Sequence, residues 1–235
     1  MAKTRDVSAV VVFAALTAIS DSITGIPQLH SGVWYSWVFL MIPLNGIILG
    51  PLNGSLATLI GVFVGHFVYF QGAEEFLFTL GAAVGSAVCG MTWNRRILPV
   101  IVYYTLGFAS YFLTPISFSL PLWGMWDTYC AYALLLLTGL MRQRISPGWI
   151  ADHIRFWIAV SSFIGVEADI LFRIFLFIPG GTYRSIYGFP VEVLREIWFL
   201  SAVSTPIQVA MSILFTCLAA PTLIAFVQRR AEKTG

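Results

Sequence analysis

Charged residues are scarce in this chain. Asp, Glu, Lys and Arg together make up 10% of the 235 residues, whereas a soluble globular domain carries about 25%. Hydrophobic residues make up 58% and the mean hydropathy is +0.85, so water cannot be the main solvent of the surface. The apolar runs are long and do not alternate, which predicts membrane-spanning helices rather than a β-barrel. We therefore expect a single all-α domain over residues 1–235, a polytopic helical membrane protein that makes several passes through the cell membrane.

Cysteine is also rare, and sequence motifs for catalysis are missing. The three cysteines lie inside apolar runs, which is typical of small core residues and not of a disulfide framework. The chain contains no His-Glu-x-x-His, Gly-x-Ser-x-Gly or Gly-x-x-x-x-Gly-Lys motif, the signatures of zinc proteases, serine hydrolases and phosphate-binding loops. We expect no enzyme activity in this chain, and any ATP hydrolysis would need another chain.

Metal, cofactor and nucleic-acid binding are not expected either. The three histidines, His30, His66 and His153, are scattered along the chain, whereas a metal site needs several ligands close together. The net charge is only +2, and the basic residues lie in short connections between apolar runs instead of forming a patch. The bilayer is the one partner that the composition itself predicts.

Eight candidate spans divide the chain, and we expect six to eight of them to cross the membrane fully. The first is expected to be a retained span, since no cleavage site for a signal peptide follows it. The last is too long for one straight crossing, so we expect Pro206 to kink it or to begin its membrane-embedded part. Just before it, Val191–Trp198 is expected to form a short amphipathic helix on the outer surface. The eight spans are Val7–Ile26, Trp34–Gly50, Gly54–Phe70, Phe76–Trp93, Ile97–Ile116, Leu122–Met141, Phe156–Ile178 and a segment within Ile197–Val227.

Basic residues collect on one side of the predicted membrane. With the N-terminus in the cytoplasm, ten of the 13 basic residues fall in cytoplasmic segments, as the positive-inside rule requires. Eight spans then place the C-terminus in the cytoplasm as well. The ten residues are Lys3, Arg5, Arg95, Arg96, Arg142, Arg144, Arg155, Arg229, Arg230 and Lys233.

Six ionisable residues lie inside the predicted spans, and five of them fall toward the outer side. Each costs a few kcal/mol near the membrane centre unless it is paired or hydrated. They are either salt bridges that hold the bundle together or the lining of a polar site that opens outward. Asp169 and Arg173 are four residues apart and can pair on one helix face. The six are Asp21, His66, Asp127, Glu167, Asp169 and Arg173.

Aromatic and small residues add two further patterns. Trp34, Trp123 and Trp126 begin spans from the outer side, which indicates either an interfacial aromatic belt or a stacking lid over a flat ligand. Ala14 and Ala18 form a small-x-x-x-small pattern on the first span. Such a pattern brings helices close together, either within this chain or against another membrane subunit.

Residues 9–70 resemble a known family. The first span carries Ala14-Ala15-Leu16-Thr17-Ala18, and a Gly50-Pro51-Leu52-Asn53-Gly54 turn joins the second and third spans. Both features are similar to those of the substrate-binding (S) components of energy-coupling-factor (ECF) vitamin transporters. The resemblance implies capture of a vitamin-like solute on the outer face, with Ala14 and Ala18 contacting a transmembrane coupling subunit that carries two cytoplasmic ATPases. The family usually has six spans, so residues 1–145 would be the family-like core and 146–235 would add further transmembrane helices.

The functional expectation is therefore a membrane-embedded solute-capture subunit of an ATP-driven importer. Its ligand groups, chosen from the topology alone, are the six ionisable residues together with Trp34, Trp123 and Trp126. One alternative is a secondary, proton-coupled transporter that uses Glu167, Asp169 and Arg173. Two others are an intramembrane enzyme in which His66 works with Glu74 or Glu75, and a structural subunit of a larger membrane complex.

Overall fold

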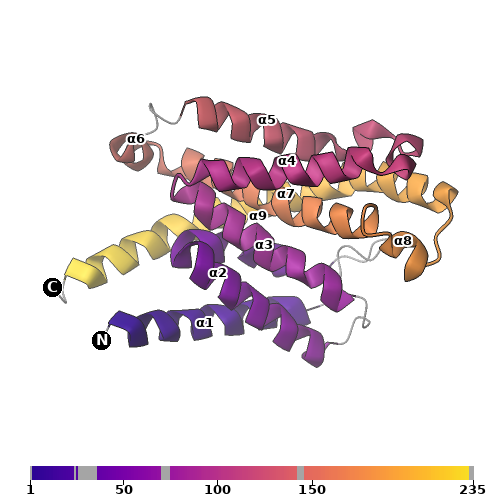
Figure 1. Cartoon of the computed structure of the whole chain (residues 1–235). Coiled ribbons are helices and arrows are strands. Elements are labelled where there is room, and N and C mark those ends of the chain that lie inside the picture. The colour runs from indigo at the N-terminus through magenta and orange to yellow at the C-terminus, as the bar shows by residue number, and fades with distance from the viewer. Residues whose placement is uncertain (1, 24, 26–35, 70–74, 142–145, 233–235) are drawn as a thin grey trace.

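The computed structural model of the chain describes residues 2–23, 25, 36–69, 75–141 and 146–232. Within these ranges every element is helical, and Figure 1 shows the helices packed as one bundle. The predicted all-α class is therefore confirmed. The elements are α1 Ala2–Ser22, η1 Val38–Leu40, α2 Met41–Val68, α3 Glu75–Trp93, α4 Ile97–Leu113, η2 Pro115–Ser119, η3 Leu122–Met125, α5 Trp126–Leu140, α6 Pro147–Asp152, α7 Ile154–Phe177, α8 Thr182–Ser185 and α9 Val191–Glu232.

The long apolar helices account for the membrane character of the chain. Among the described residues, three helical stretches are both long and apolar enough to cross a membrane, namely Val38–Val68, Glu75–Trp93 and Val191–Phe226. Val7–Ser22 and Ile97–Leu113 are apolar but shorter. Each of the eight predicted spans overlaps a helix, and the second and third share α2. The expected number of full crossings, six to eight, stays a prediction.

The chain turns back on itself inside α2. Gly50 has φ 80° and ψ 177°, a backbone conformation essentially restricted to glycine, and Pro51 begins the next helical arm, where its missing N–H costs nothing. Asn45 Nδ2 lies 2.8 Å from Thr58 Oγ1. Thirteen residues along a straight helix would separate these residues by about 20 Å. The two arms of α2 therefore lie side by side, as the predicted turn between the second and third spans requires.

Asn45 fastens this hairpin to α1. Its side-chain amide donates one hydrogen bond to Thr58 Oγ1 at 2.8 Å and another to Thr17 Oγ1 at 2.9 Å. Each threonine hydroxyl in turn donates to its own helix, Thr17 to the Phe13 carbonyl and Thr58 to the Gly54 carbonyl. Asn45, Thr17 and Thr58 are all fully buried. Since lipid offers no replacement hydrogen bonds, the three side chains fix the register of α1 against both arms of α2.

Helix α7 lies in the middle of the bundle and joins the two parts of the chain. One core cluster contains Phe39 of η1, Ile42 of α2, Val166 and Ile170 of α7, and Val209 of α9. Residues before and after position 146 thus share one hydrophobic core.

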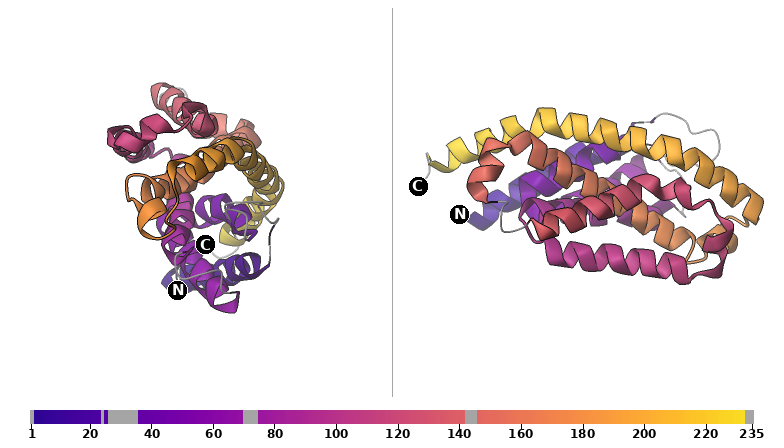
Figure 2. Two further views of the ribbon diagram at one scale, coloured as in Figure 1. Left: turned by 90° about the vertical axis from the view of Figure 1, so that its right-hand side faces the viewer. Right: turned by 90° about the horizontal axis from the view of Figure 1, so that it is seen from above.

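Helix α9 differs from the sequence expectation. It runs unbroken over 42 residues with Pro206 and Pro221 inside it, and Figure 2 shows it as a gentle arc along the whole molecule. A helix of that length spans about 63 Å, more than the roughly 40–45 Å of a bilayer with its headgroups. The prediction of a separate surface helix over Val191–Trp198 was wrong. Leu194, Ile197 and Trp198 are buried and form the first turns of α9.

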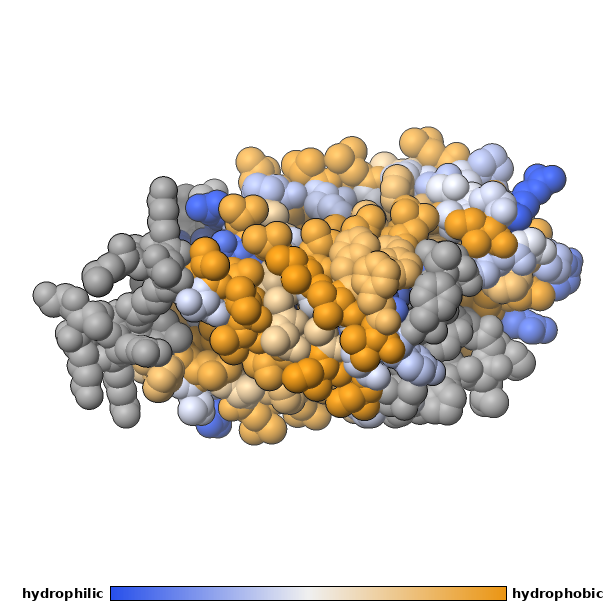
Figure 3. Space-filling view, turned by 90° about the horizontal axis from the view of Figure 1, so that it is seen from below, coloured by the Kyte–Doolittle hydropathy of each residue, from blue (hydrophilic) through white to orange (hydrophobic). Residues whose placement is uncertain are grey.

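The two ends of the bundle contain different segments of the chain. The beginning of α1, the end of α9 and the turn between α3 and α4, which carries Arg95 and Arg96, lie at one end, and α8 lies at the other (Figure 1). Between the ends, apolar side chains cover the middle of the face shown in Figure 3, and hydrophilic ones gather toward the ends. This arrangement fits a helical bundle embedded in a bilayer.

The close contact of α3 with the hairpin gives a test of the packing. A Cβ atom at Gly90 would lie 2.6 Å from the Pro51 nitrogen and 2.8 Å from the Gly46 carbonyl oxygen. We expect Gly90→Ala to lower the free energy of unfolding by about 1–3 kcal/mol, because backbone must move. Gly148→Ala is the matched control, since only Ser146 Oγ lies within 4 Å, at 3.9 Å. Equal unfolding temperatures of the two variants in nanodiscs would contradict this packing.

The topology gives a second test. Asp152 ends α6 and Arg184 lies in α8, at opposite ends of the bundle (Figure 1). We expect an impermeant thiol reagent added outside intact cells to label Arg184→Cys and to leave Asp152→Cys unlabelled, as the positive-inside rule requires. The unsubstituted chain gives the background from its native cysteines, and the reverse labelling pattern would show that the orientation is inverted.

Candidate functional site

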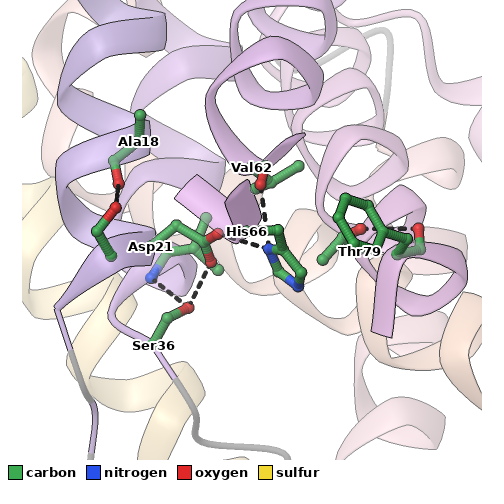
Figure 4. Close-up of polar contacts among 9 residues, drawn as sticks. Ala18, Asp21, Ser36, Val62, His66 and Thr79 are labelled. Carbon is green, nitrogen blue, oxygen red and sulfur yellow. Dashed lines mark hydrogen bonds and ion pairs between the residues drawn. The ribbon is translucent and has the colours of Figure 1, made fainter. Parts of the chain in front are cut away.

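The last turns of α1 and α2 carry an ionisable pair inside the bundle. His66 Nδ1 lies 2.7 Å from Asp21 Oδ2, and Ser36 donates its hydroxyl hydrogen to Asp21 Oδ1 at 2.8 Å, as Figure 4 shows. Asp21 is 1% exposed and His66 2% exposed. A Cβ atom at Gly65 would lie 2.5 Å from Asp21 Oδ2, so glycine at this position lets the two helices approach closely enough for the pair to form.

The neighbours of His66 determine which ring nitrogen is available. Nδ1 contacts Asp21 Oδ2 and also the Val62 carbonyl oxygen at 3.0 Å. Both atoms are acceptors, so Nδ1 carries a hydrogen. Nε2 is buried and has no hydrogen-bond partner among the described residues. The imidazole can therefore offer Nε2 to a ligand, either as an acceptor or, when protonated, as a donor.

A second charged pair lies on α7, toward the same end of the bundle. Arg173 Nε donates to Asp169 Oδ1 at 2.8 Å, four residues away on one helix face, as the sequence spacing predicts. Arg173 also lies within electrostatic range of Glu75 and Asp21. The Arg173 side chain is 21% exposed and that of Asp169 is 4% exposed, so the arginine is the more accessible member of the pair.

The remaining two predicted residues, Asp127 and Glu167, form a separate centre between α5, α7 and α9. Thr128 donates its hydroxyl hydrogen to Glu167 Oε2 at 2.8 Å and its backbone N–H to Asp127 Oδ1 at 2.9 Å. Thr205 of α9 lies 2.5 Å from Asp127 Oδ2. Glu167 is fully buried and Asp127 is 2% exposed. The six ionisable residues predicted as one site are thus divided between two centres.

Two of the three predicted tryptophans lie on the surface of the bundle, and the third lies outside the described residues. Trp34 falls outside the described residues. Trp123 and Trp126 are 52% and 47% exposed. Trp123 packs edge-on against Phe199, and Trp126 donates its indole hydrogen to the Ala202 carbonyl at 2.9 Å. Both rings therefore lie along α9 on the surface of the bundle, a placement typical of an interfacial belt.

Other aromatic rings lie beside the charged groups. The Phe76 ring centroid is 5.1 Å from that of His66. Phe78 and Phe177 both lie within about 6 Å of Tyr187, and the Tyr187 hydroxyl contacts Glu75 Oε1 at 3.5 Å. Sequence reasoning did not select these rings, because phenylalanine in an apolar run carries no signal of its position. It also missed Ser36, Thr128 and Thr205, because hydroxyl side chains in helices usually bond to their own backbone.

Ala14 and Ala18 are buried within this chain. They are 6% and 9% exposed, and a Cβ atom at Gly61 of α2 would lie 2.7 Å from the Ala14 carbonyl oxygen. Of the two roles that the sequence left open, packing within the chain is the one present in this fold. The surface of α1 carries large aliphatic side chains instead, at Val7, Val11, Val12, Leu16 and Ile19.

The described residues form no metal-binding cluster, and no related protein helps to identify the site. In the described part of the chain, no group of three or more His, Cys, Asp or Glu side chains is placed to hold a metal ion. Comparison with known protein families, with curated proteins and with solved structures finds no match for the chain.

The Asp21–His66 pair gives a test at the level of stability. Breaking a buried ion pair on one side costs about 3–5 kcal/mol, because the other charge stays buried without its partner. We expect His66→Leu to lower the free energy of unfolding by this amount, and Asp21→Asn/His66→Leu to recover part of the loss. His153→Leu, at an exposed histidine, is the matched control and should change stability by less than about 0.5 kcal/mol. Equal losses in the single and double variants would show that the two side chains do not interact.

Proposed function

We propose that this protein is a multi-pass, membrane-embedded solute-capture subunit of an ATP-driven importer of the energy-coupling-factor type. It binds one small, vitamin-like molecule at the end of the bundle opposite its termini. The observation that carries this proposal is the buried Asp21–His66 pair, whose Nε2 has no hydrogen-bond partner among the described residues. Ionisable groups inside membrane helices are costly, and they mark ligand or ion sites more often than not.

The neighbouring groups suit a flat, partly polar solute. His66 Nε2 offers one hydrogen bond, and the Arg173 guanidinium, 21% exposed, can bind a carboxylate or carbonyl oxygen with two parallel hydrogen bonds. Phe76 beside His66, and Phe78 and Tyr187 beside Glu75, present ring faces and edges on which a planar ligand can stack. Ligand sites commonly combine such an apolar lining with a few fixed polar groups.

Energy for import would come from other chains. This sequence contains no phosphate-binding loop, so a transmembrane coupling subunit and cytoplasmic ATPases would supply ATP hydrolysis. Because Ala14 and Ala18 are buried against α2, a coupling subunit would contact this chain through other residues. The proposal therefore keeps the partners implied by the resemblance and does not assign their contact surface to these two alanines.

A secondary, proton-coupled carrier is the second candidate. The Asp169–Arg173 pair at 2.8 Å and the fully buried Glu167 favour it, since ion pairs that can exchange partners are typical of such carriers. Proteoliposomes that contain this chain alone distinguish the two. Accumulation of solute driven by a pH gradient would establish the carrier and exclude the importer subunit.

Ligand binding by the purified chain is the direct test. We expect one member of a panel of water-soluble vitamins to raise the unfolding temperature in detergent without ATP, because a ligand at 100 times its Kd stabilises the folded state by about 2.7 kcal/mol. His66→Asn should weaken this binding at least about tenfold, since the asparagine amide nitrogen takes the place of Nδ1 and can still donate to Asp21 but leaves no group at the position of Nε2. The matched substitution His153→Asn, at an exposed histidine just before α7, should leave the affinity unchanged. A panel without any stabilising member, or equal effects of the two substitutions, would contradict the proposed site.

A further inference from the structure

The Asp127–Glu167 centre has more acceptor atoms than hydrogens to satisfy them. Thr205 has one hydroxyl hydrogen, yet its Oγ1 lies 2.5 Å from Asp127 Oδ2 and 2.7 Å from the Ser201 carbonyl oxygen. Both are acceptors, so that hydrogen can serve only one of them. Glu167 Oε1, on a fully buried side chain, has no hydrogen-bond partner among the described residues. A buried acceptor without a donor destabilises the packed bundle, and more so when it is charged.

Among the described residues, the groups that act on this centre do not supply a positive charge. Asp127 and Glu167 interact with each other, and the other ionisable groups that act on them are the Tyr104 hydroxyl from α4 and Asp169 from α7. α5 and α9 contribute the neutral hydroxyls of Thr128 and Thr205. The Arg173 guanidinium, one turn further along α7 from Asp169, is bonded to that carboxylate. Two ionised carboxylates side by side in this setting would be strongly unfavourable.

One added proton resolves both problems. We propose that Asp127 and Glu167 together form a proton-binding site that holds one exchangeable proton in the packed bundle. The proton comes from water and converts one carboxylate into a carboxylic acid. Asp127 can then donate to Thr205 Oγ1 while Thr205 donates to the Ser201 carbonyl, or the proton can lie between the two carboxyl groups and reach Glu167 Oε1. This site is separate from the Asp21–His66 centre and does not depend on which solute the chain binds.

The site links the packing of α5, α7 and α9 to pH. If these helices separate, water reaches both carboxyl groups. Like other exposed carboxyl groups, both are then ionised at neutral pH, so the proton is released. The packed bundle therefore binds one proton more than a loosened one. Stability falls with rising pH wherever the folded state holds more protons than the unfolded state, so this site stabilises the packed bundle at low pH and loses that effect as pH rises.

Infrared spectroscopy of the full chain in nanodiscs tests the proposal without any ligand. We expect the carbonyl band of a protonated carboxylic acid in the native protein at about pH 6, where exposed carboxyl groups are ionised. The band should be lost or shifted in both Glu167→Gln and Asp127→Asn, because both side chains hold the proton. It should be unchanged in Glu192→Gln, a matched substitution at an exposed glutamate.

The same samples give a second readout. Between about pH 6 and pH 8 the unfolding temperature of the native protein and of Glu192→Gln should fall, and that of Glu167→Gln should fall less, because this variant has no proton to lose at the centre. Absence of the acid band from the native protein would overturn the proposal, as would a band altered by only one of the two substitutions. A rise in unfolding temperature with added sodium, in a native protein that lacks the band, would show that the centre holds a cation instead.

Discussion

The rest of the structure depends on the hydrogen bonds that Asn45 makes where α2 turns back at Gly50. In an apolar environment an amide keeps its position because no competing partner is available. Asn45 binds Thr17 on α1 and Thr58 on the second arm of α2, so three helical segments share one register. That register brings His66 next to Asp21, 45 residues earlier in the chain. A slip of one residue in either arm would rotate His66 by about 100° and separate its imidazole from Asp21.

Helix α7 separates the two polar centres and contributes to each. Glu167 and Asp169 are two residues apart, so their side chains leave the helix about 200° from each other. Glu167 contacts Thr128 of α5, whereas Asp169 pairs with Arg173 and lies against Gly81 of α3. The helix is buried over most of its length, and the hydroxyls of Tyr103 and Tyr104 donate to its Ala168 and Ile164 carbonyls. A change at one centre would therefore reach the other through this helix.

Several parts of this arrangement could be predicted from the sequence. The scarcity of charge predicts the helical membrane class, and the Gly50-Pro51 pair predicts the reversal, because only glycine adopts the required backbone conformation and proline suits the start of a helix. The four-residue spacing of Asp169 and Arg173 predicts their ion pair. The prediction that Val191–Trp198 forms a separate helix failed, because an amphipathic spacing of charged residues has the same pattern whether the helix ends there or continues. Ser36, Thr128 and Thr205 carry no signal at all, since any serine or threonine hydroxyl can bond to nearby backbone.

The sequence by itself determined which solvent the chain occupies, where its helices lie and which few ionisable residues must be paired, because these follow from local composition and spacing. Only the tertiary structure decided the partners. It joined Asp21 to His66 and Asp127 to Glu167, buried Ala14 and Ala18 under α2, and placed Trp123 and Trp126 on the surface. The physical reason is that a hydrogen bond or ion pair depends on distances of a few ångströms between helices that are distant in sequence, and the packing of many apolar side chains sets those distances.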